Sequence, residues 1–209
     1  MHIILLGAPG SGKGTQSHLI SKKLNLPIIS TSYLLKKQSL YSSKKENIII
    51  NNCIQNGILV PDNIVINLIK KRITKKDCKT GYILDGFPRT IKQADSMESA
   101  NIFINCVIEI IVDEKTLIKR ISGRRVHTQS GRIYHTIFSP PIIKNKDDLT
   151  GEKLIIRSDD NPKTIKKRIE EYNKTKVCLI NFFKKRNKVF QINGNQSIEK
   201  IHQDIVDII

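Results

Sequence analysis

A glycine-rich segment near the start of the chain carries the residues best suited to bind a polyphosphate. Residues 7–13, GAPGSGK, fit the spacing G-x-x-x-x-G-K and follow directly on an apolar run at 1–6. Glycines let consecutive backbone N–H groups point at phosphate oxygens, the following helix presents its positive end, and the lysine adds a mobile charge. The next residue is Gly14 where the general motif has Ser or Thr, and a hydroxyl follows at Thr15. The segment therefore predicts phosphate binding, while direct magnesium ligation from the loop stays open.

Asp85 ends an apolar strand that we expect at 81–85. In a protein with a phosphate-binding loop, a carboxylate at such a point holds magnesium directly or through water. Ligands of parallel sheets bind beyond the carboxyl ends of the strands, so we expect Asp85 to lie beside the loop.

Three arginines lie where their guanidinium groups could meet the same anion. Arg120 and Arg124 are four residues apart on a helix expected at 114–125, where they border the apolar inward face. Arg168 borders the apolar stripe of a long helix expected at 162–185. A guanidinium at the margin of a buried face needs an anionic partner, and its planar shape suits a transferring phosphoryl group.

Short apolar strands alternate with helical patterns along the whole chain. We expect strands at 1–6, 26–30, 81–85, 106–112 and 188–193. We expect helices at 16–24, 61–73, 90–99, 114–125, 162–185 and 197–209, and two more within 31–56 with a junction around Ser42 and Ser43 and a stop at Gly57. This alternation predicts an α/β fold, with a five-stranded parallel sheet covered by helices on both faces.

The composition indicates an ordinary globular protein. A chain of 209 residues, 39% hydrophobic and 26% charged, can bury one sizeable core and still hold an inserted subdomain. No apolar run reaches the length of a membrane span, and the apolar start lacks the basic leader of a signal peptide. We therefore expect a cytoplasmic protein without membrane contact.

The formal net charge of +17 comes largely from lysines spread along the whole chain. Scattered lysines are typical of a solvated surface, so the charge does not favour a nucleic-acid partner. The four cysteines, Cys53, Cys78, Cys106 and Cys178, form no C-x-x-C pair. They indicate neither a zinc site nor a disulfide framework, and they fit a reducing compartment.

Taken in order, these motifs resemble those of the adenylate kinase family, in the bacterial type with a long lid. The resemblance covers nearly the whole chain and rests on IILLGAPGSGKGT at 3–15, LDGFPRT at 84–90 with Gln93, GRRVH at 123–127, GRIYH at 131–135 and RSDD at 157–160. It implies three parts: a P-loop core of 1–29, 61–122 and 161–209, a helical lid over the nucleoside monophosphate at 30–60, and a small, mostly β insertion at 123–160. We call the last two the NMP segment and the LID segment.

The resemblance implies magnesium-dependent, reversible phosphoryl transfer from ATP to AMP, giving two ADP, by a monomer. No general base is needed, since the acceptor is already a phosphate oxygen. Contacts to ATP would come from Gly10, Ser11, Gly12, Lys13, Gly14, Thr15, Arg120, Arg124, Ile133, Tyr134 and Gln196. Contacts to AMP would come from Thr31, Lys36, Ile58, Leu59, Val60, Gly86, Phe87, Pro88, Arg89, Gln93, Arg157 and Arg168. The catalytic charges would be those of Lys13, Arg89, Arg124, Arg157 and Arg168, with Asp85 holding magnesium through water.

The resemblance also points to a polar cluster in the LID segment. His127, Ser130, Asp147 and Thr150 occupy the spacing at which some members of the family carry cysteines around a structural zinc. Because no thiolates are available here, we expect a hydrogen-bonded cluster without zinc.

Two alternative functions remain open at this point. The first is another nucleoside monophosphate kinase, which would differ in the monophosphate that Gln93 and the NMP segment accept. The second is a non-catalytic nucleotide-binding or RNA-binding protein with a P-loop, which would bind RNA with strong salt dependence and form no ADP.

The NMP segment departs from the family pattern in a way that makes a prediction. Ser32-Tyr33 follows Thr31 where Gly-Asp is usual, and Lys36 stands where an arginine normally clamps the AMP phosphate. Lysine keeps the charge and loses the bidentate fork, so we expect AMP binding to be weaker and activity to be retained. A Lys36→Arg variant should lower the Michaelis constant for AMP in steady-state assays. An unchanged or raised constant would contradict this reasoning.

Overall fold

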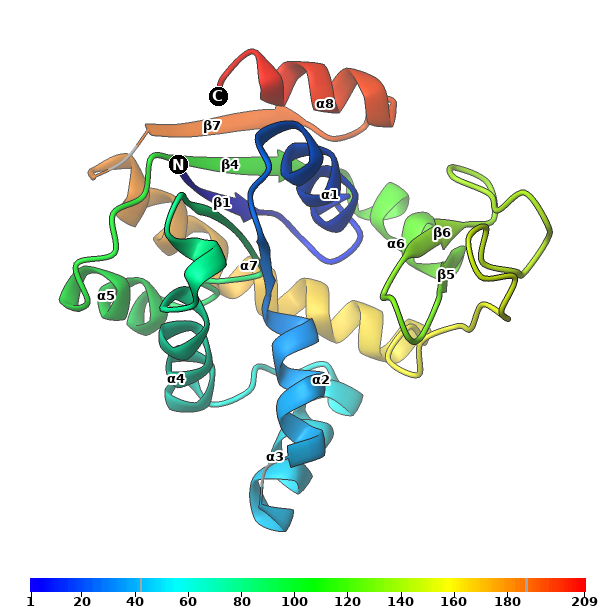
Figure 1. Ribbon diagram of the computed structural model, residues 1–209, viewed down its shortest axis with the longest axis horizontal. Helices are drawn as coiled ribbons and strands as arrows, with labels where there is room; N and C mark the ends of the chain where they lie inside the picture. Colours follow the sequence, from blue (N-terminus) through cyan, green and yellow to red (C-terminus); the bar gives the residue numbers. More distant parts are fainter. Residues whose placement is uncertain (42, 187) are drawn as a thin grey trace.

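The computed structural model describes residues 1–41, 43–186 and 188–209. Its centre is a five-stranded sheet whose strands are β1 (His2–Leu6), β2 (Ile28–Ser30), β3 (Tyr82–Asp85), β4 (Cys106–Ile111) and β7 (Lys188–Asn193). The strands lie in the order β2-β3-β1-β4-β7 and every neighbouring pair is parallel. The expected five-stranded parallel sheet is thereby confirmed (Figure 1).

Helices cover both faces of this sheet because side chains along each strand alternate between them. In β1, Ile3 and Leu5 pack with α1 (Lys13–Leu24) and α8 (Ile198–Val206). Ile4 and Leu6 face the opposite way, in the larger core that includes side chains of α4 (Asp62–Ile73), α5 (Ile91–Ser99) and α7 (Pro162–Lys184). Each such buried aliphatic side chain contributes about 1.5–3 kcal/mol through removal from water.

The NMP segment extends from the edge of the sheet as two helices, α2 (Thr31–Tyr41) and α3 (Lys44–Asn56), seen at the bottom of Figure 1. Of the expected junction, Ser42 lies outside the described residues. Ser43 caps α3, its hydroxyl accepting a hydrogen bond from the backbone N–H of Glu46 at 3.3 Å. Gly57 ends α3 as expected, its N–H donating to the carbonyls of Cys53 and Ile54.

Helix α6 (Glu114–Ser122) is shorter than predicted. We expected a helix at 114–125, whereas α6 ends at Ser122 and Arg124 begins strand β5 (Arg124–Val126). Gly123 is the C-cap, and its carbonyl accepts a hydrogen bond from the N–H of Thr136 at 3.0 Å, just after the partner strand β6 (Ile133–His135). A Cβ on Gly123 would lie 2.3 Å from the ring of His135, so only glycine fits there. Arg120 and Arg124 therefore do not share a helix face, and the prediction that placed them there was wrong.

The LID segment is a separate lobe, on the right of Figure 1, and holds less regular strand than expected. The antiparallel pair β5-β6 has three residues in each strand, and three isolated bridges, such as Val126 with Ile155, join other parts of the lobe. Turns and irregular segments form the remainder. A short 3₁₀ helix, η1 (Lys76–Cys78), was not anticipated. Within the described ranges, no helix is both long and apolar enough to cross a membrane.

Helix α7 connects the LID segment to the core and orients Arg168. Its apolar stripe is buried as predicted, with Ile165, Ile169, Leu179 and Phe183 each at most 5% exposed. Arg168 lies next to Ile169 at the edge of this stripe, and it is half-buried.

The start of α7 offers a test of this helix's stability. The side chain of Asn161 accepts a hydrogen bond from the N–H of Thr164 at 2.9 Å. An Asn161→Ala variant should lose about 1 kcal/mol of unfolding free energy, which corresponds to a melting temperature about 2–4 °C lower in calorimetry. Asn161→Asp, which keeps an acceptor, is the matched control. Equal melting temperatures for the alanine variant and the unchanged protein would show that the cap is not stabilising.

Candidate functional site

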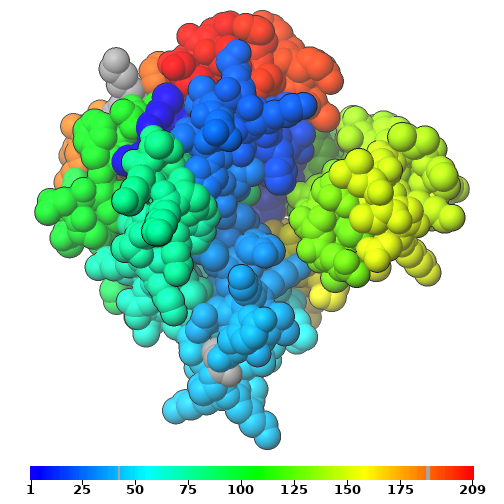
Figure 2. Space-filling view, in the orientation of Figure 1, coloured from blue at the N-terminus to red at the C-terminus, as the bar shows by residue number. Residues whose placement is uncertain are grey.

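A large cleft opens beyond the carboxyl ends of the sheet strands. Its volume is about 1160 Å³, and its walls include the segment 7–15, the start of α2, the loop 57–60, the segment after β3, the LID segment and α7. In Figure 2 the surface is hollowed between the yellow-green LID lobe and the blue and cyan surface of the first 60 residues. Parallel sheets bind ligands at this edge, so the cleft is the natural place for a site.

The loop after β1 has the backbone that phosphate binding requires. Gly10 and Gly12 adopt φ of 83° and 98°, which side chains with a Cβ rarely tolerate. Lys13 folds back on the loop, its Nζ lying 2.6 Å from the carbonyl of Gly7 and 2.9 Å from that of Ala8. Burial lowers the pKa of Lys13 to about 8. A phosphate in the loop would give this ammonium a stronger partner than two carbonyls do.

Two neighbouring carboxylates hold three of the expected arginines together. Arg157 binds Asp159 through Nε at 2.8 Å and a terminal nitrogen at 2.7 Å. Arg168 lies 3.0 Å from Asp159 and 3.7 Å from Asp160. Arg124 makes a two-pronged contact with Asp160.

These pairs leave the cleft with more positive than negative charge. Burial lowers the pKa of Arg168 to about 10, and the charges of Arg157, Arg124 and Arg89 act in the same direction against Asp159. Burial would raise the pKa of Asp159, yet its arginine partners hold it below the usual value. Groups with such perturbed titration, gathered in a cleft, favour a functional site for anions.

Arg89 completes the cationic wall from the segment after β3. Its Nε donates to the carbonyl of Gly86 at 2.8 Å, and no carboxylate of the described residues lies within ion-pair distance. The side chain still meets water in the open cleft, while the surrounding protein desolvates it enough to lower its pKa. Lys36, across the cleft, has its pKa lowered by partial burial and then by Arg157.

On the side expected for AMP, most of the named residues line the cleft. The hydroxyl of Thr31 donates to the carbonyl of Asp85 at 3.0 Å, which fixes α2 against β3. The lining residues are Thr31, Lys36, Ile58, Leu59, Val60, Gly86, Pro88, Arg89, Gln93, Arg157 and Arg168. Phe87 is the exception, because its side chain is 1% exposed and packs in the core.

On the side expected for ATP, Arg120 is held by the main chain. It donates to the carbonyls of Ser11 at 3.4 Å and Gly194 at 2.8 Å, and its guanidinium lies 5.7 Å from the ring centre of Phe138. The lining residues are Gly10, Gly12, Lys13, Gly14, Thr15, Arg120, Arg124, Ile133, Tyr134 and Gln196. Ser11 does not line the cleft, since its side chain is buried below the loop.

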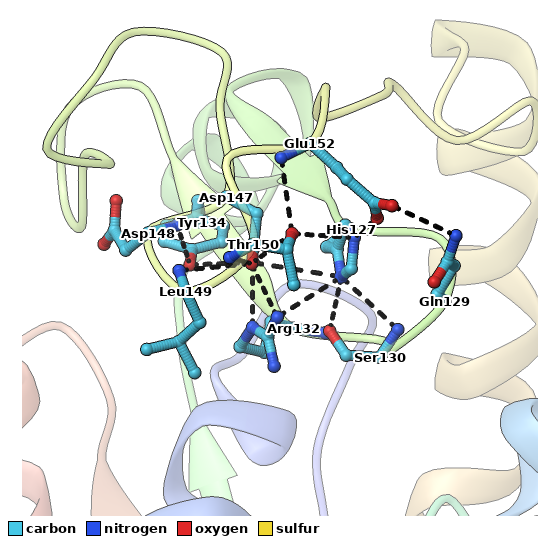
Figure 3. Close-up of polar contacts among 10 residues, drawn as sticks. All are labelled: His127, Gln129, Ser130, Arg132, Tyr134, Asp147, Asp148, Leu149, Thr150 and Glu152. Atoms are coloured by element: carbon cyan, nitrogen blue, oxygen red, sulfur yellow. Dashed lines mark hydrogen bonds and ion pairs between the residues drawn. The ribbon is translucent and has the colours of Figure 1, made fainter.

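The four polar residues expected to cluster in the LID segment lie together around Asp147 and His127 (Figure 3). Thr150 donates to Asp147 through its hydroxyl at 2.9 Å, and the His127 ring contacts Ser130 at 2.7 Å. Arg132 grips Asp147 with two nitrogens, and this fork holds the pKa of Asp147 far below its usual range.

Several residues that pair with the predicted ones, in the LID cluster and among the arginines of the cleft, were not predicted from the sequence. Arg132 and Glu152 belong to the LID cluster, and Tyr134, expected only over ATP, also places its hydroxyl 3.0 Å from Asp147. Asp159 and Asp160 were noted only as part of a motif, although they organise the arginines. Their position next to Arg157, in a chain with few carboxylates, was the signal that could have identified them.

Possible metal ligands are sparse outside the phosphate loop. Among the described residues, no three His, Cys, Asp or Glu side chains are grouped so as to hold a metal ion. Asp85 does face the loop: its Oδ2 would lie 3.9 Å from a Cβ on Gly14. Its carboxylate and the hydroxyl of Thr15 are the oxygen ligands that magnesium prefers, so the residues present fit a magnesium ion carried in on phosphates.

The sheet, its loop and the arginine-lined cleft together define a P-loop nucleotide-binding protein of the phosphotransferase kind. The sequence model of the family described as Adenylate kinase matches residues 5–188. The chain is 50% identical to an adenylate kinase of Buchnera aphidicola subsp. Acyrthosiphon pisum (strain Tuc7), over 100% of this chain and 99% of that protein. Adenylate kinases of Hamiltonella defensa and Francisella tularensis subsp. novicida are each 44% identical, over at least 99% of this chain and 98% of the relative. The chain belongs to the adenylate kinase family.

The titration of Lys13 yields a prediction about polyphosphate binding. With a pKa of about 8 in the free protein, Lys13 is charged below that pH. Bound phosphates raise its pKa, so affinity is greatest below pH 8 and falls as Lys13 deprotonates above it. For inorganic tripolyphosphate, the ratio of wild-type affinity to that of a Lys13→Met variant should fall about tenfold between pH 7 and 9.5 in calorimetric titrations.

The variant corrects for the titration of tripolyphosphate itself, since both proteins meet the same ligand species. A ratio that stays constant over this range would show that Lys13 does not titrate there.

Proposed function

We propose that the cleft catalyses reversible phosphoryl transfer from ATP to AMP, giving two ADP, in nucleotide salvage and energy homeostasis. Membership of the adenylate kinase family makes the chain a nucleoside monophosphate kinase, a phosphotransferase. The observation that carries the proposal is the meeting of Lys13 and four arginines at one cleft beyond the phosphate loop. A phosphoryl group in transfer spreads negative charge over oxygens that such groups can bridge.

In this proposal, the role of each residue follows from the wall of the cleft that it lines. ATP phosphates lie in the loop 10–15, and Lys13 leaves its two carbonyl partners to follow the transferred group. Arg89, Arg157 and Arg168 bind the AMP phosphate opposite, and Arg124 reaches the group between them. The protein's work is alignment and charge neutralisation, because the attacking phosphate oxygen needs no base.

In this arrangement the nucleotide base of ATP and that of AMP lie at the two ends of the cleft. Arg120 and the backbone at Gln196 border the ATP base, since the Gln196 side chain itself binds Asp204 at 2.8 Å. Ile133 and Tyr134 cover ATP from the LID segment, while the residues 58–60 and Gln93 border the AMP base. Closure of the NMP and LID segments over the P-loop core would exclude water, which could otherwise accept the phosphoryl group.

Magnesium would enter with ATP, held by phosphate oxygens and, through water, by Asp85. When bound, it neutralises charge on the phosphates. We further propose a monomer that acts in the cytoplasm. All four cysteines are unpaired, three of them buried, which suits a reducing compartment.

A coupled assay of ATP with AMP, CMP, UMP and GMP tests the proposed substrate. AMP should give by far the highest kcat/KM, and ADP should form from both nucleotides. A preference for another monophosphate would indicate the alternative kinase. Salt-dependent RNA binding without ADP formation would indicate the non-catalytic alternative.

Arg89 provides a sharper prediction, because it combines desolvation with the lack of a carboxylate partner. An Arg89→Gln variant should lose about 10²–10³-fold in kcat/KM for AMP. Its melting temperature should stay the same or rise slightly, since the variant removes a positive charge that repels Lys13 and Arg157. Lys92→Gln, a nearby exposed charge on α5 outside the cleft, is the control and should keep full activity. Normal turnover of the Arg89 variant at saturating AMP would contradict its proposed role.

A further inference from the structure

Gln93 is the only amide among the described cleft residues near Arg89, and its side chain is 2% exposed. It lies in the first turn of α5, whose N-cap is Thr90. An amide presents an oxygen that accepts and a nitrogen that donates, so its recognition of a base depends on which way round it is held. The surrounding hydrogen bonds decide that orientation.

Two contacts hold the Gln93 amide, and both require the same orientation. The backbone N–H of Arg89 donates to Oε1 at 2.8 Å. On the other side, Nε2 donates to Oδ1 of Asp62 at 2.8 Å. A backbone N–H can only donate and a carboxylate can only accept, so turning the amide by 180° would set donor against donor and acceptor against acceptor.

Asp62 is itself fixed, and it stands outside the cleft. The hydroxyl of Thr90 donates to the same Oδ1 at 3.0 Å and accepts from the N–H of Gln93 at 3.1 Å. Asp62 is half-buried at the start of α4 and is not among the residues that line the cleft. Of the two residues that donate to Asp62, only Gln93 lines the cleft, so Gln93 is the direct route from Asp62 to a bound base.

After these contacts, Gln93 keeps one unused N–H on Nε2 and one unused lone pair on Oε1. This side-by-side donor and acceptor complements a base edge with an unprotonated ring nitrogen beside an amino group. It opposes an edge with a ring N–H beside an oxo group, which presents the reverse pattern. A wrong pairing would leave buried polar groups without partners, which is costly.

We propose that Asp62 is a positioning residue that sets the Gln93 amide to select 6-amino over 6-oxo purine monophosphates. The inference rests on the proposed function in one respect, namely that Gln93 borders the base of the monophosphate. Asp62 makes the reverse orientation of the amide unfavourable with a charged acceptor, and the N–H of Arg89 does so with a neutral donor.

The test compares AMP with inosine monophosphate, which has a ring N–H and an oxo group where AMP has an unprotonated nitrogen and an amino group. In Asp62→Leu, only the N–H of Arg89 still opposes reversal of the amide. The ratio of kcat/KM for AMP to that for inosine monophosphate should fall about tenfold, equal to about 1.4 kcal/mol. The change should come from the monophosphate KM values, with the KM for ATP unaltered.

Ile69→Val is the control for general loosening of α4. Ile69 is 1% exposed on the same helix but does not line the cleft, so this variant should lower stability and leave the ratio unchanged. If Ile69→Val changes the ratio as much as Asp62→Leu does, or if Asp62→Leu leaves it unchanged, the inference is overturned.

Failure of the proposed function would look different. A wild-type protein that forms no ADP from ATP and AMP, or a Gln93→Leu variant with unaltered KM for AMP, would remove the base contact on which the inference rests. A normal wild-type assay, together with a constant ratio in Asp62→Leu, would overturn the role of Asp62 alone.

Discussion

Mutual repulsion among cationic side chains is the constraint on which the rest of this site depends. Burial lowers the pKa of Lys13, and the charges of Arg89, Arg168 and Arg124 lower it further, against the opposing effect of Asp85. Such groups stay together only because the protein supplies counter-charge, and Asp159 and Asp160 provide it for three of the arginines. Even with Asp85, these carboxylates are fewer than the five cations Lys13, Arg89, Arg124, Arg157 and Arg168. The remaining positive potential attracts the polyanion that the proposed reaction requires.

The parallel sheet brings these cationic side chains together at one of its edges. Parallel strands direct their carboxyl ends to one edge, so the loop after β1 and the segment after β3 open into the same space. Helix α7 then brings Arg168 to that edge, since burial of Ile165 and Ile169 leaves one direction for its neighbour. The hydrophobic core thus determines where the charges point.

These relations explain how far the sequence could predict the structure. The loop, the strand that ends at Asp85 and the edge position of Arg168 follow from local pattern, and the structure agrees. Arg124 does not, because the predicted helix was extended past Gly123, a residue type that often ends helices, whereas α6 ends at Ser122 and Arg124 lies in β5. Ser11 and Phe87 lie within the motifs, yet their side chains turn inward, which spacing alone does not reveal.

The contacts least visible in the sequence are those that orient another side chain. Asp62 and Gln93 are 31 positions apart on different helices, and their hydrogen bond exists only because α4 packs beside α5. Asp62 also resembles an ordinary acidic residue in the first turn of a helix, where the helix dipole favours it. A residue of this kind is found by following the hydrogen bonds of a cleft residue outward.

In the LID cluster the charge of Asp147 is paired within the lobe, whereas the cleft keeps an excess of positive charge. The paired charge serves folding, and the excess charge serves binding. Asp147 receives Arg132, Tyr134 and Thr150, so its charge is fully matched inside the lobe. Its lowered pKa means that this stabilisation is present above the ordinary aspartate value of 3.8 and is lost only as the pH falls below it. The contacts of Asp147 therefore persist throughout the neutral range. Lys13, with a pKa of about 8, changes charge near that range, so the titration of Lys13 makes phosphate binding in the cleft depend on pH.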